Sequence, residues 1–340
     1  MKQSCIFCLL ITMVLLFFTH CKKENPAYHF EEFQWQQSID AEQSRLCPGA
    51  FANPYGLSDS VFIDCSVEGA NLTSHAAAPK EEALVLAYNI ARGGNFQQIL
   101  NRLLNNPEVQ VPDILLLSEV DRGCSRTGNH HIVYELAQAL GMYYVYGVEY
   151  YEIADTCEHG NAILSRYPLG NVRLIRFAQQ GRYYLIGGGE GDERLGGRVA
   201  LFADVKIGEK ILHVYSTHLE AYFFDNDIKI AQSKQLAEDA ENKSFNVVVG
   251  GDMNSYTYAY ASPPESDFQV SEFLQRGLED AHASIPFHQR YTTHDPSDLI
   301  IDLIFSRPGT SRLAGIGSDS LWGTFSDHLP VWALISVTGN

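Results

Sequence analysis

The most constraining feature of this sequence is a set of short apolar runs that each meet polar residues at one end. Such runs, when polar or glycine-containing stretches bound them, are typical of buried β-strands. Five of the runs adjoin the following residues: Asn89, Glu119, His218, Asp252 with Asn254, and Asp327 with His328. Strand ends are rigid positions from which polar side chains can be presented to a ligand. The pattern therefore predicts a functional site at one edge of a β-rich domain.

Helical segments alternate with these strands along the chain. Strands are predicted at 83–88, 113–117, 143–148, 162–164, 245–249, 300–305 and 331–335. Helical apolar spacing is found at 96–104, 132–140, 228–241 and 268–274. The apolar arms 199–205 and 211–215 flank Gly208 and predict a hairpin. Many strands with intervening helices favour an α/β domain in which two packed sheets are covered by helices.

One run carries an acidic residue at its centre rather than at its end. Asp302 interrupts the apolar segment 300–304. A carboxylate buried within a strand is unfavourable unless a partner compensates its charge or satisfies its oxygens. The sequence therefore predicts that Asp302 has a polar partner inside the fold.

The start of the chain has the character of a targeting segment. Lys2 precedes a nearly unbroken apolar run, which at about 13 residues is short for a membrane span. Cys21 and a polar stretch follow, and this arrangement resembles a bacterial lipoprotein signal, although His20 replaces the usual small residue. We expect a signal peptide at 1–20 and a lipid on Cys21 that anchors an exported protein at the cell envelope. Secretion without a lipid and an uncleaved anchor are the alternatives.

The rest of the chain divides into two regions. Residues 21–80 contain several prolines and few periodic signals, which predicts a tether and an N-terminal extension. Residues 81–340 are predicted to form the main domain. The hydrophobic content of 45% and the charged content of 19% are typical of a folded globular protein rather than a disordered one.

Cysteine usage agrees with export. Of the seven cysteines, two lie in the signal peptide and Cys21 would carry the lipid, which leaves Cys47, Cys65, Cys124 and Cys157. An even number in an oxidising compartment favours two disulfides, and we expect Cys47–Cys65 and Cys124–Cys157. Four unlinked buried thiols are the alternative. None of the four lies in a Cys-x-x-Cys motif, which disfavours a zinc site.

The acidic balance of the chain limits the classes of partner. Lys and Arg number 24 against 41 Asp and Glu, which gives a net charge of -17, and no basic stretch appears. Tight binding to a phosphate backbone relies on cationic surface, so non-specific nucleic-acid binding is disfavoured. A nuclease is not excluded, because bound metal ions can supply positive charge at the site.

Seven stretches of the sequence occur in an order that resembles one known superfamily. They are YNIARG, LLLSEVDRG, HGNAILSRYPL, YSTHLEA, VVVGGDMNS, YTTHDPSDLIIDLIFS and FSDHLPVW, within about residues 83 to 337. In this order they resemble the endonuclease/exonuclease/phosphatase superfamily, most closely its bacterial secreted metal-dependent hydrolases. The resemblance implies a four-layer α/β sandwich of two packed mixed β-sheets flanked by helices, with the site at one edge. It also implies hydrolysis of a phosphate ester with Mg²⁺, or with Mn²⁺ or another divalent cation.

The resemblance implies catalytic roles for four of the polar residues. His328 would be the catalytic histidine, and Asp302 would accept its other ring N–H. Such a carboxylate orients the imidazole and stabilises the imidazolium as charge develops. Asp252 would position or deprotonate the attacking water, and His218 would contact the phosphate or assist the leaving oxygen.

Other residues are implied to bind the cation and the substrate. Glu119 would be the metal carboxylate, Asp327 a second ligand or its support, and Asn89 a contact near the metal or the phosphate, in line with the preference of Mg²⁺ for oxygen ligands. Substrate contacts are implied for Asn254, Asn161, Asn89, Arg122 and Arg198. For both arginines, an ordinary surface position is the alternative.

We therefore predict an exported, lipid-anchored hydrolase of phosphate esters, either a phosphodiesterase or a phosphatase. A secreted nuclease and a sphingomyelinase-like phospholipase C are alternatives, so the substrate is a phosphodiester, a phospholipid head group or a nucleic acid. Three aromatic residues near Asn254 suit base stacking, lipid contact or plain packing: Tyr256, Tyr258 and Tyr260. A non-catalytic surface lipoprotein is the alternative of a different class. No obligate protein partner is indicated.

Overall fold

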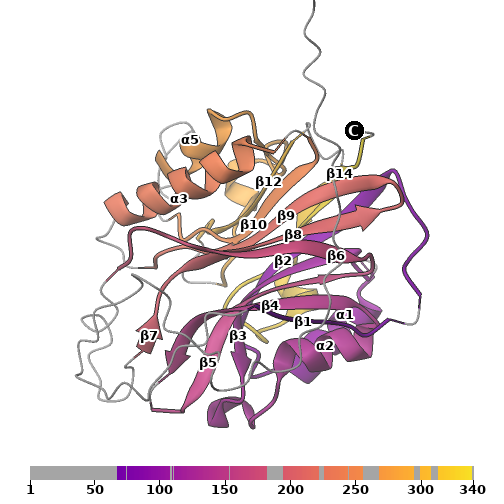
Figure 1. Cartoon of the computed structure of the whole chain (residues 1–340), viewed down its shortest axis with the longest axis vertical. Helices are drawn as coiled ribbons and strands as arrows, with labels where there is room; N and C mark the ends of the chain where they lie inside the picture. The colour runs from indigo at the N-terminus through magenta and orange to yellow at the C-terminus, as the bar shows by residue number, and fades with distance from the viewer. Residues whose placement is uncertain are drawn as a thin grey trace, which may run out of the picture.

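The protein is a four-layer α/β sandwich (Figure 1). The computed structural model describes residues 67–73, 75–107, 109, 111–152, 154–181, 194–221, 226–243, 245–255, 268–294, 299–307 and 313–338. Two mixed β-sheets pack face to face, and helices cover the outer face of each sheet. This architecture confirms the fold predicted from the sequence.

The first sheet contains eight strands. Its order is β1 (Val67–Asn71), β4 (Tyr143–Glu152), β5 (Cys157–Ser165), β3 (Ile114–Arg122), β2 (Glu82–Arg92), β14 (Val331–Ser336) and β13 (Ala314–Ile316), with β7 (Arg194–Gly196) paired to β4. Strands β2 and β3 run parallel. A parallel pair needs a crossover connection, which helix α1 (Phe96–Asn105) provides.

The second sheet contains six strands. Its order is β11 (Glu279–Asp280), β12 (Asp302–Arg307), β10 (Val247–Asp252), β9 (Lys210–His218), β8 (Val199–Ile207) and β6 (Leu169–Arg176). Strands β8 and β9 form the predicted hairpin, whose turn contains Gly208 at a φ of 64°. Strands β9 and β10 run parallel, and helix α3 (Asn226–Glu241) connects them.

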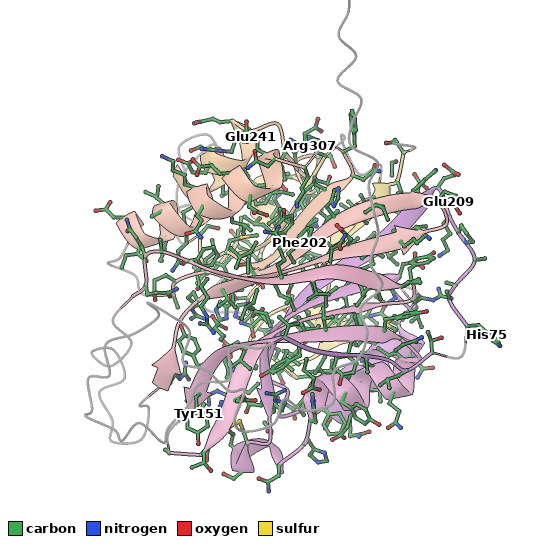
Figure 2. The ribbon with its side chains drawn as sticks, viewed as in Figure 1. His75, Tyr151, Phe202, Glu209, Glu241 and Arg307 are labelled. Carbon is green, nitrogen blue, oxygen red and sulfur yellow. A yellow bond between two sulfur atoms is a disulfide. The ribbon has the colours of Figure 1, made fainter. Side chains whose placement is uncertain are left out.

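Alternation of side chains along the strands divides the core into layers. In β3, Ile114 and Leu116 face the second sheet, whereas Leu115 and Leu117 face α1 and helix α2 (Ile132–Leu140). Helices α3 and α5 (Phe268–Leu274) pack on the second sheet, and the short helix α6 (Asp319–Trp322) precedes β14. Side chains fill the space between the layers (Figure 2). A Cβ added at Gly250 would lie 2.7 Å from Leu116 Cδ1, so a glycine there lets the sheets approach closely.

The N-terminal boundary of the domain differs from the prediction. Strand β1 lies within residues 21–80, the predicted tether and extension, yet it pairs with β4 and belongs to the first sheet. The sheet therefore begins before residue 81, because β1 was too short and too polar to be recognised as a strand. Among the described residues, no helix has both the length and the apolar character needed to cross a bilayer.

One of the two predicted disulfides is present, between Cys124 and Cys157. The other predicted features at the N-terminus and in one loop lie outside the described residues: the segment 1–20, Cys21, the pair Cys47–Cys65, and Tyr256, Tyr258 and Tyr260.

Candidate active site

The carboxyl ends of both parallel strand pairs lie at one edge of the sandwich. On the second sheet, Asp252 of β10 pairs in register with His218 of β9 and with Asp302 of β12. On the first sheet, Asn89 and Glu119 occupy the corresponding ends of β2 and β3. The two ends meet, because the Asn89 amide donates to Asp252 Oδ2 at 3.0 Å. The predicted convergence of separate strand ends is therefore present in the fold.

A β-bulge places Glu119 at this edge. Between Leu117 and Val120, strand β3 holds one residue more than its partner β5, so that Ser118 and Glu119 both lie opposite Asn161. Glu119 has a φ of 53°. A bulge bends the strand and redirects a side chain out of the regular alternation. Leu117 and Val120 share an apolar face of the sheet, and the bulge lets Glu119 lie off that face.

Backbone strain is concentrated around the same edge. Of the eight non-glycine residues with positive φ in the described chain, four are found here: Ala91, Arg92, Glu119 and Asn254. Left-handed conformations cost roughly 1–2 kcal/mol per residue. Strain of this kind persists where the surrounding structure enforces it, and it clusters at functional sites. The strained positions therefore support a functional assignment for this edge.

His328 is the partner that Asp302 requires. Asp302 Oδ2 lies 2.7 Å from His328 Nδ1, and both side chains are buried. Ser326 fixes the segment before β14, since its Oγ donates to Asn89 O at 2.7 Å and accepts from His328 N at 3.1 Å. Burial opposes the imidazolium form, but the carboxylates of Asp302 and Asp252 outweigh it and raise the pKa of His328 to about 10. The imidazole is therefore protonated at neutral pH.

Asp252 lies at the centre of this group. Its Oδ2 accepts the Asn89 amide and lies 3.4 Å from His218 Nε2 and 3.7 Å from His328 Nε2. Burial raises the pKa of Asp252 to about 7, with Asp302 adding to the shift and His328 opposing it. A carboxyl group that titrates near neutral pH suits a general base.

A further layer of charge surrounds His218. Arg198 donates to Glu149 Oε1 at 2.8 Å, and Glu149 Oε2 lies 3.9 Å from His218 Nδ1. Burial lowers the pKa of His218 far below its usual value, and Arg198 adds to this effect, so the imidazole is neutral. Glu149 was not among the predicted residues. An acidic residue inside the aromatic stretch 143–152 is the same signal that identified Asp302, and it would have identified Glu149.

The predicted phosphate contacts Asn254 and Asn161 are both buried at this edge. Asn254 Nδ2 donates to Leu219 O at 3.0 Å, and Asn161 Nδ2 donates to Val199 O at 3.1 Å. The buried Lys229 donates to Asn254 O at 3.3 Å and supports the loop. Each amide group carries a second hydrogen that a phosphate oxygen can accept. The backbone contacts therefore fix the two amides without using up their capacity to donate.

Glu119 borders a groove of about 670 Å³. This Glu119 groove is lined by Ala91, Arg92, Asn95, Glu119, His294, Thr324, Phe325, Ser326 and Asp327. Burial opposes ionisation of Glu119, but His159 and His328 outweigh it and hold the pKa of the carboxyl group below its usual range. Asp327 is exposed and lines the same groove. Arg92, also exposed, is a groove cation that was not predicted, and its positive φ was not visible in the sequence.

The two predicted arginines have different surroundings. Arg122 does not line the groove, because its guanidinium forms ion pairs with Glu68 and Glu158 and lies 5.0 Å from the Tyr146 ring centre. These pairings do not support a substrate contact for Arg122, which stays a prediction. Consecutive residues of a strand point to opposite faces, so Arg122 points away from the face on which Asp121 contacts His159. Arg198 does belong to the site, but as the buried partner of Glu149 rather than as a surface cation.

The oxygen ligands of the Glu119 groove fit a hard divalent cation. Glu119 is ionised at neutral pH, and Asp327 supplies a second carboxylate. Mg²⁺ is commonly held by one or two carboxylates and retains several waters, which a groove of this kind can accommodate. Ligand atoms of Asp252, Asp302 and His328 also lie within 4.8 Å of one another. The Asp302–His328 hydrogen bond already engages two of those ligand groups, so the groove is the better candidate.

A family model described as Endonuclease/Exonuclease/phosphatase family matches residues 86–328. This span contains every site residue discussed above. Among curated proteins, no sequence match is found.

Solved structures share the fold at low sequence identity. An endonuclease/exonuclease/phosphatase from Beutenbergia cavernae DSM 12333 has a TM-score of 0.58 and 16% identity, over 76% of this chain and 72% of that one. The human Nocturnin catalytic domain with a bound sulfate anion has a TM-score of 0.55 and 18% identity, over 78% and 97%. D. rerio TDP2 complexed with a single strand DNA product has a TM-score of 0.51 and 15% identity, over 75% and 99%. At such identities the likeness concerns the fold alone.

Proposed function

The chain belongs to the endonuclease/exonuclease/phosphatase family, and from this premise we propose that it is a Mg²⁺-dependent hydrolase of phosphate esters, a phosphodiesterase or a phosphatase. One observation carries the proposal. The buried Asp302–His328 pair, Asp252 and His218 meet at the strand ends beside the carboxylate of Glu119. A binding module has no need of this set, because burying several ionisable groups together is unfavourable without a chemical use.

The buried groups of the second sheet and of the segment before β14 are assigned the proton transfer and the hydrogen bonds to the phosphate. Asp252 takes a proton from the attacking water, a role that its pKa of about 7 supports. The imidazolium of His328, oriented by Asp302, stabilises negative charge on the phosphoryl oxygens. The neutral His218 lies 3.4 Å from Asp252 and can donate a hydrogen bond toward the leaving oxygen.

Glu119 and Asp327 are the residues we assign to the cation, with Asn89 beside them. When bound, Mg²⁺ supplies Lewis acidity that polarises the phosphoryl oxygen. The Asn89 amide contacts both Asp252 and Glu119, so it fixes the position of the Glu119 carboxylate relative to the Asp252 carboxylate.

The Glu119 groove favours a small phosphate ester over a long polyanion. Its volume of about 670 Å³ is in the range of small-molecule sites. Arg92 supplies its cationic lining, and the other basic residue there, His294, is already paired with Asp319. The net charge of -17 disfavours a long phosphate backbone. A nuclease is the second candidate, because the D. rerio TDP2 structure with a single strand DNA product shares the fold.

A substrate panel tests the proposal. We expect Mg²⁺- or Mn²⁺-dependent hydrolysis of bis-p-nitrophenyl phosphate that EDTA abolishes and that the His328→Ala protein lacks. Plasmid DNA and sphingomyelin in the same panel separate the nuclease and the phospholipase C from a small-ester enzyme. No metal-dependent turnover on any of these substrates would contradict the proposal and favour a surface binding lipoprotein.

We also propose that the protein is exported and lipid-anchored through Cys21. The Cys124–Cys157 disulfide supports export, because disulfides persist in oxidising compartments. Cell fractionation tests this: the wild type is expected in the membrane fraction, and Cys21→Ala is expected in the soluble fraction. Identical fractionation of the two proteins argues against the lipid.

A further inference from the structure

We propose that Asp121 and His159 form a pair that positions Glu119 for its cation, an inference that rests on the proposed function. Arg126 and the Cys124–Cys157 disulfide hold this pair in place. Asp121 lies two residues after Glu119 in β3 and faces His159 across the ladder to β5. Asp121 Oδ1 is 2.9 Å from His159 Nδ1, and the two side chains are 0% and 2% exposed. The catalytic roles assigned above do not use this buried pair.

Because Glu119 lies in the bulge of β3, its position depends on contacts made by neighbouring side chains. The extra residue of a bulge interrupts the regular ladder, so neighbouring hydrogen bonds fix its backbone less firmly. Regular pairing resumes at Val120 and continues with Asp121, which lies opposite His159. The Asp121–His159 contact is therefore the side-chain link next to the bulge that ties β3 to β5. Asn161, two residues further along β5, lies opposite the bulge itself.

Removal of His159 takes away the imidazole that Asp121 contacts across the ladder, so the orientation of Glu119 is expected to loosen.

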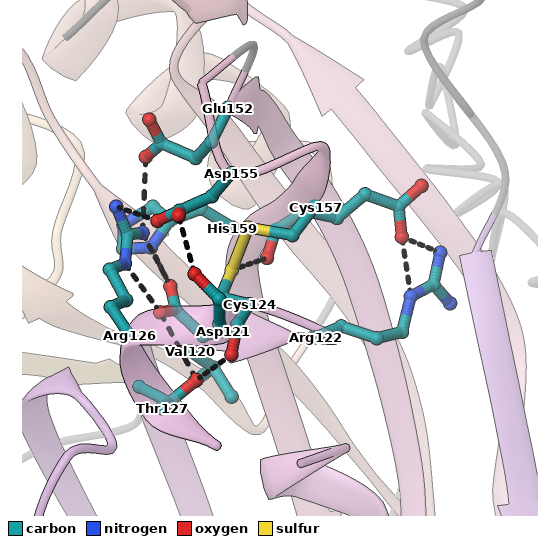
Figure 3. The surroundings of a disulfide bond; sticks show 12 residues. Val120, Asp121, Arg122, Cys124, Arg126, Thr127, Glu152, Asp155, Cys157 and His159 are labelled. Atoms are coloured by element: carbon teal, nitrogen blue, oxygen red, sulfur yellow. Dashed lines mark hydrogen bonds and ion pairs between the residues drawn. A yellow bond between two sulfur atoms is a disulfide. The ribbon is translucent and has the colours of Figure 1, made fainter. Parts of the chain in front are cut away.

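Arg126 fixes the other side of Asp121. Its Nε and Nη2 lie 2.7 and 2.8 Å from the two carboxylate oxygens of Asp121, and Nη2 also lies 3.2 Å from Glu152 Oε1 (Figure 3). A bidentate contact of this kind fixes the plane of the carboxylate as well as its position. The His159 imidazole, which faces one of those oxygens, is oriented in turn.

The disulfide closes the loop that carries Arg126. Cys124 follows the end of β3, and Cys157 is the first residue of β5, two positions before His159 (Figure 3). The bond therefore joins the two strands beside the Asp121–His159 contact. When it is reduced, the strand ends and the loop with Arg126 can separate, and the orientation of Glu119 is expected to loosen.

The chain offers a matched control in a second buried carboxylate–imidazole pair. Asp204 and His213 face each other across β8 and β9, with 2.5 Å between Asp204 Oδ1 and His213 Nδ1. Both side chains are buried. They are cross-strand neighbours, like Asp121 and His159, but they lie far along the strands from Asp252 and His218. Loss of His213 should affect stability without affecting the cation.

Mn²⁺ binding, measured by the EPR signal of the free ion, tests the inference independently of turnover. Partners that orient metal ligands are typically worth about 10–100-fold in affinity. We expect His159→Ala to weaken Mn²⁺ binding by such a factor and His213→Ala to leave it unchanged. His159→Asn keeps a donor toward Asp121 and should recover part of the loss. The Cys124→Ser/Cys157→Ser protein should also bind Mn²⁺ more weakly than the wild type.

The outcomes separate the inference from the proposed function. If folded His159→Ala binds Mn²⁺ as the wild type does, the pair is structural and the inference is wrong. If His159→Ala does not fold, the folded His159→Asn protein decides, because wild-type affinity combined with a lower melting temperature overturns the inference. Weaker Mn²⁺ binding in the variants supports it even if no ester is hydrolysed. A wild type that binds no Mn²⁺ overturns both.

Discussion

Replacing Asp302 with asparagine isolates the effect of one buried carboxylate on the charge of His328. Asp302 and Asp252 together raise the pKa of His328 from 6.5 to about 10, against the effect of burial. That shift corresponds to about 5 kcal/mol, at about 1.4 kcal/mol per pH unit. Asparagine has the same size and can still accept from His328 Nδ1, which lies 2.7 Å from Asp302 Oδ2, but it carries no charge. Burial of the imidazolium is then less well compensated, so the pKa of His328 falls. If it returns only to its ordinary value, about 3% of the imidazole is protonated at pH 8.

Turnover of the Asp302→Asn protein at pH 8 should therefore fall by about 30-fold, the factor that this protonated fraction implies. The assay is kcat/KM for bis-p-nitrophenyl phosphate between pH 5.5 and 9 with saturating Mg²⁺. Because the pKa of His328 is raised, the wild type keeps its imidazolium until the pH approaches 10. The variant loses it as the pH rises through about 6.5, so its activity should decline over that window. Parallel pH profiles in the two proteins would refute the assigned role of Asp302.

Three further predictions follow from described contacts. Asp252→Ala and His328→Ala should each reduce kcat by several orders of magnitude with little change in fold by circular dichroism, and near-normal turnover contradicts their roles. Reduction of Cys124–Cys157, whose partners are 33 residues apart, should lower the free energy of unfolding by about 4 kcal/mol, measured by urea titration with and without reductant. Burial opposes ionisation of Glu68, but His131 and Arg122 outweigh it and lower the pKa to about 2. The stabilisation, at most about 3 kcal/mol, is present above pH 4.5 and is lost as the pH falls toward 2, so Glu68→Gln should flatten the acid limb of the stability curve.

The sequence was sufficient for elements whose periodicity is regular. Helices α2 and α5 have the predicted limits, 132–140 and 268–274, because their apolar spacing is helical over the whole of each segment. The strands were predicted too short at the functional edge. Asn89, Glu119, His218 and Asp252 lie within strands rather than after them, because backbone pairing continues through the polar residues.

The remaining differences come from backbone geometry that residue types do not specify. Nothing in LLLSEVDRG indicates that β3 gains a residue at Glu119, and that shift decides which neighbours face the site. It turns Asp121 toward His159, and it leaves Arg122 to pair with Glu68 and Glu158. Residue types alone therefore do not distinguish Arg122, which pairs with two glutamates, from Asp121, which pairs with His159.

The hydrogen bond between Asn89 and Asp252 has a consequence for when the protein becomes active. It joins residues 163 positions apart, one from each sheet, and His328, the partner of Asp302, lies later in the sequence than both. A polypeptide that emerges from the ribosome N-terminus first cannot complete this centre until residue 328 is out. A nascent chain shorter than this therefore lacks the arrangement of side chains on which the proposed hydrolysis depends.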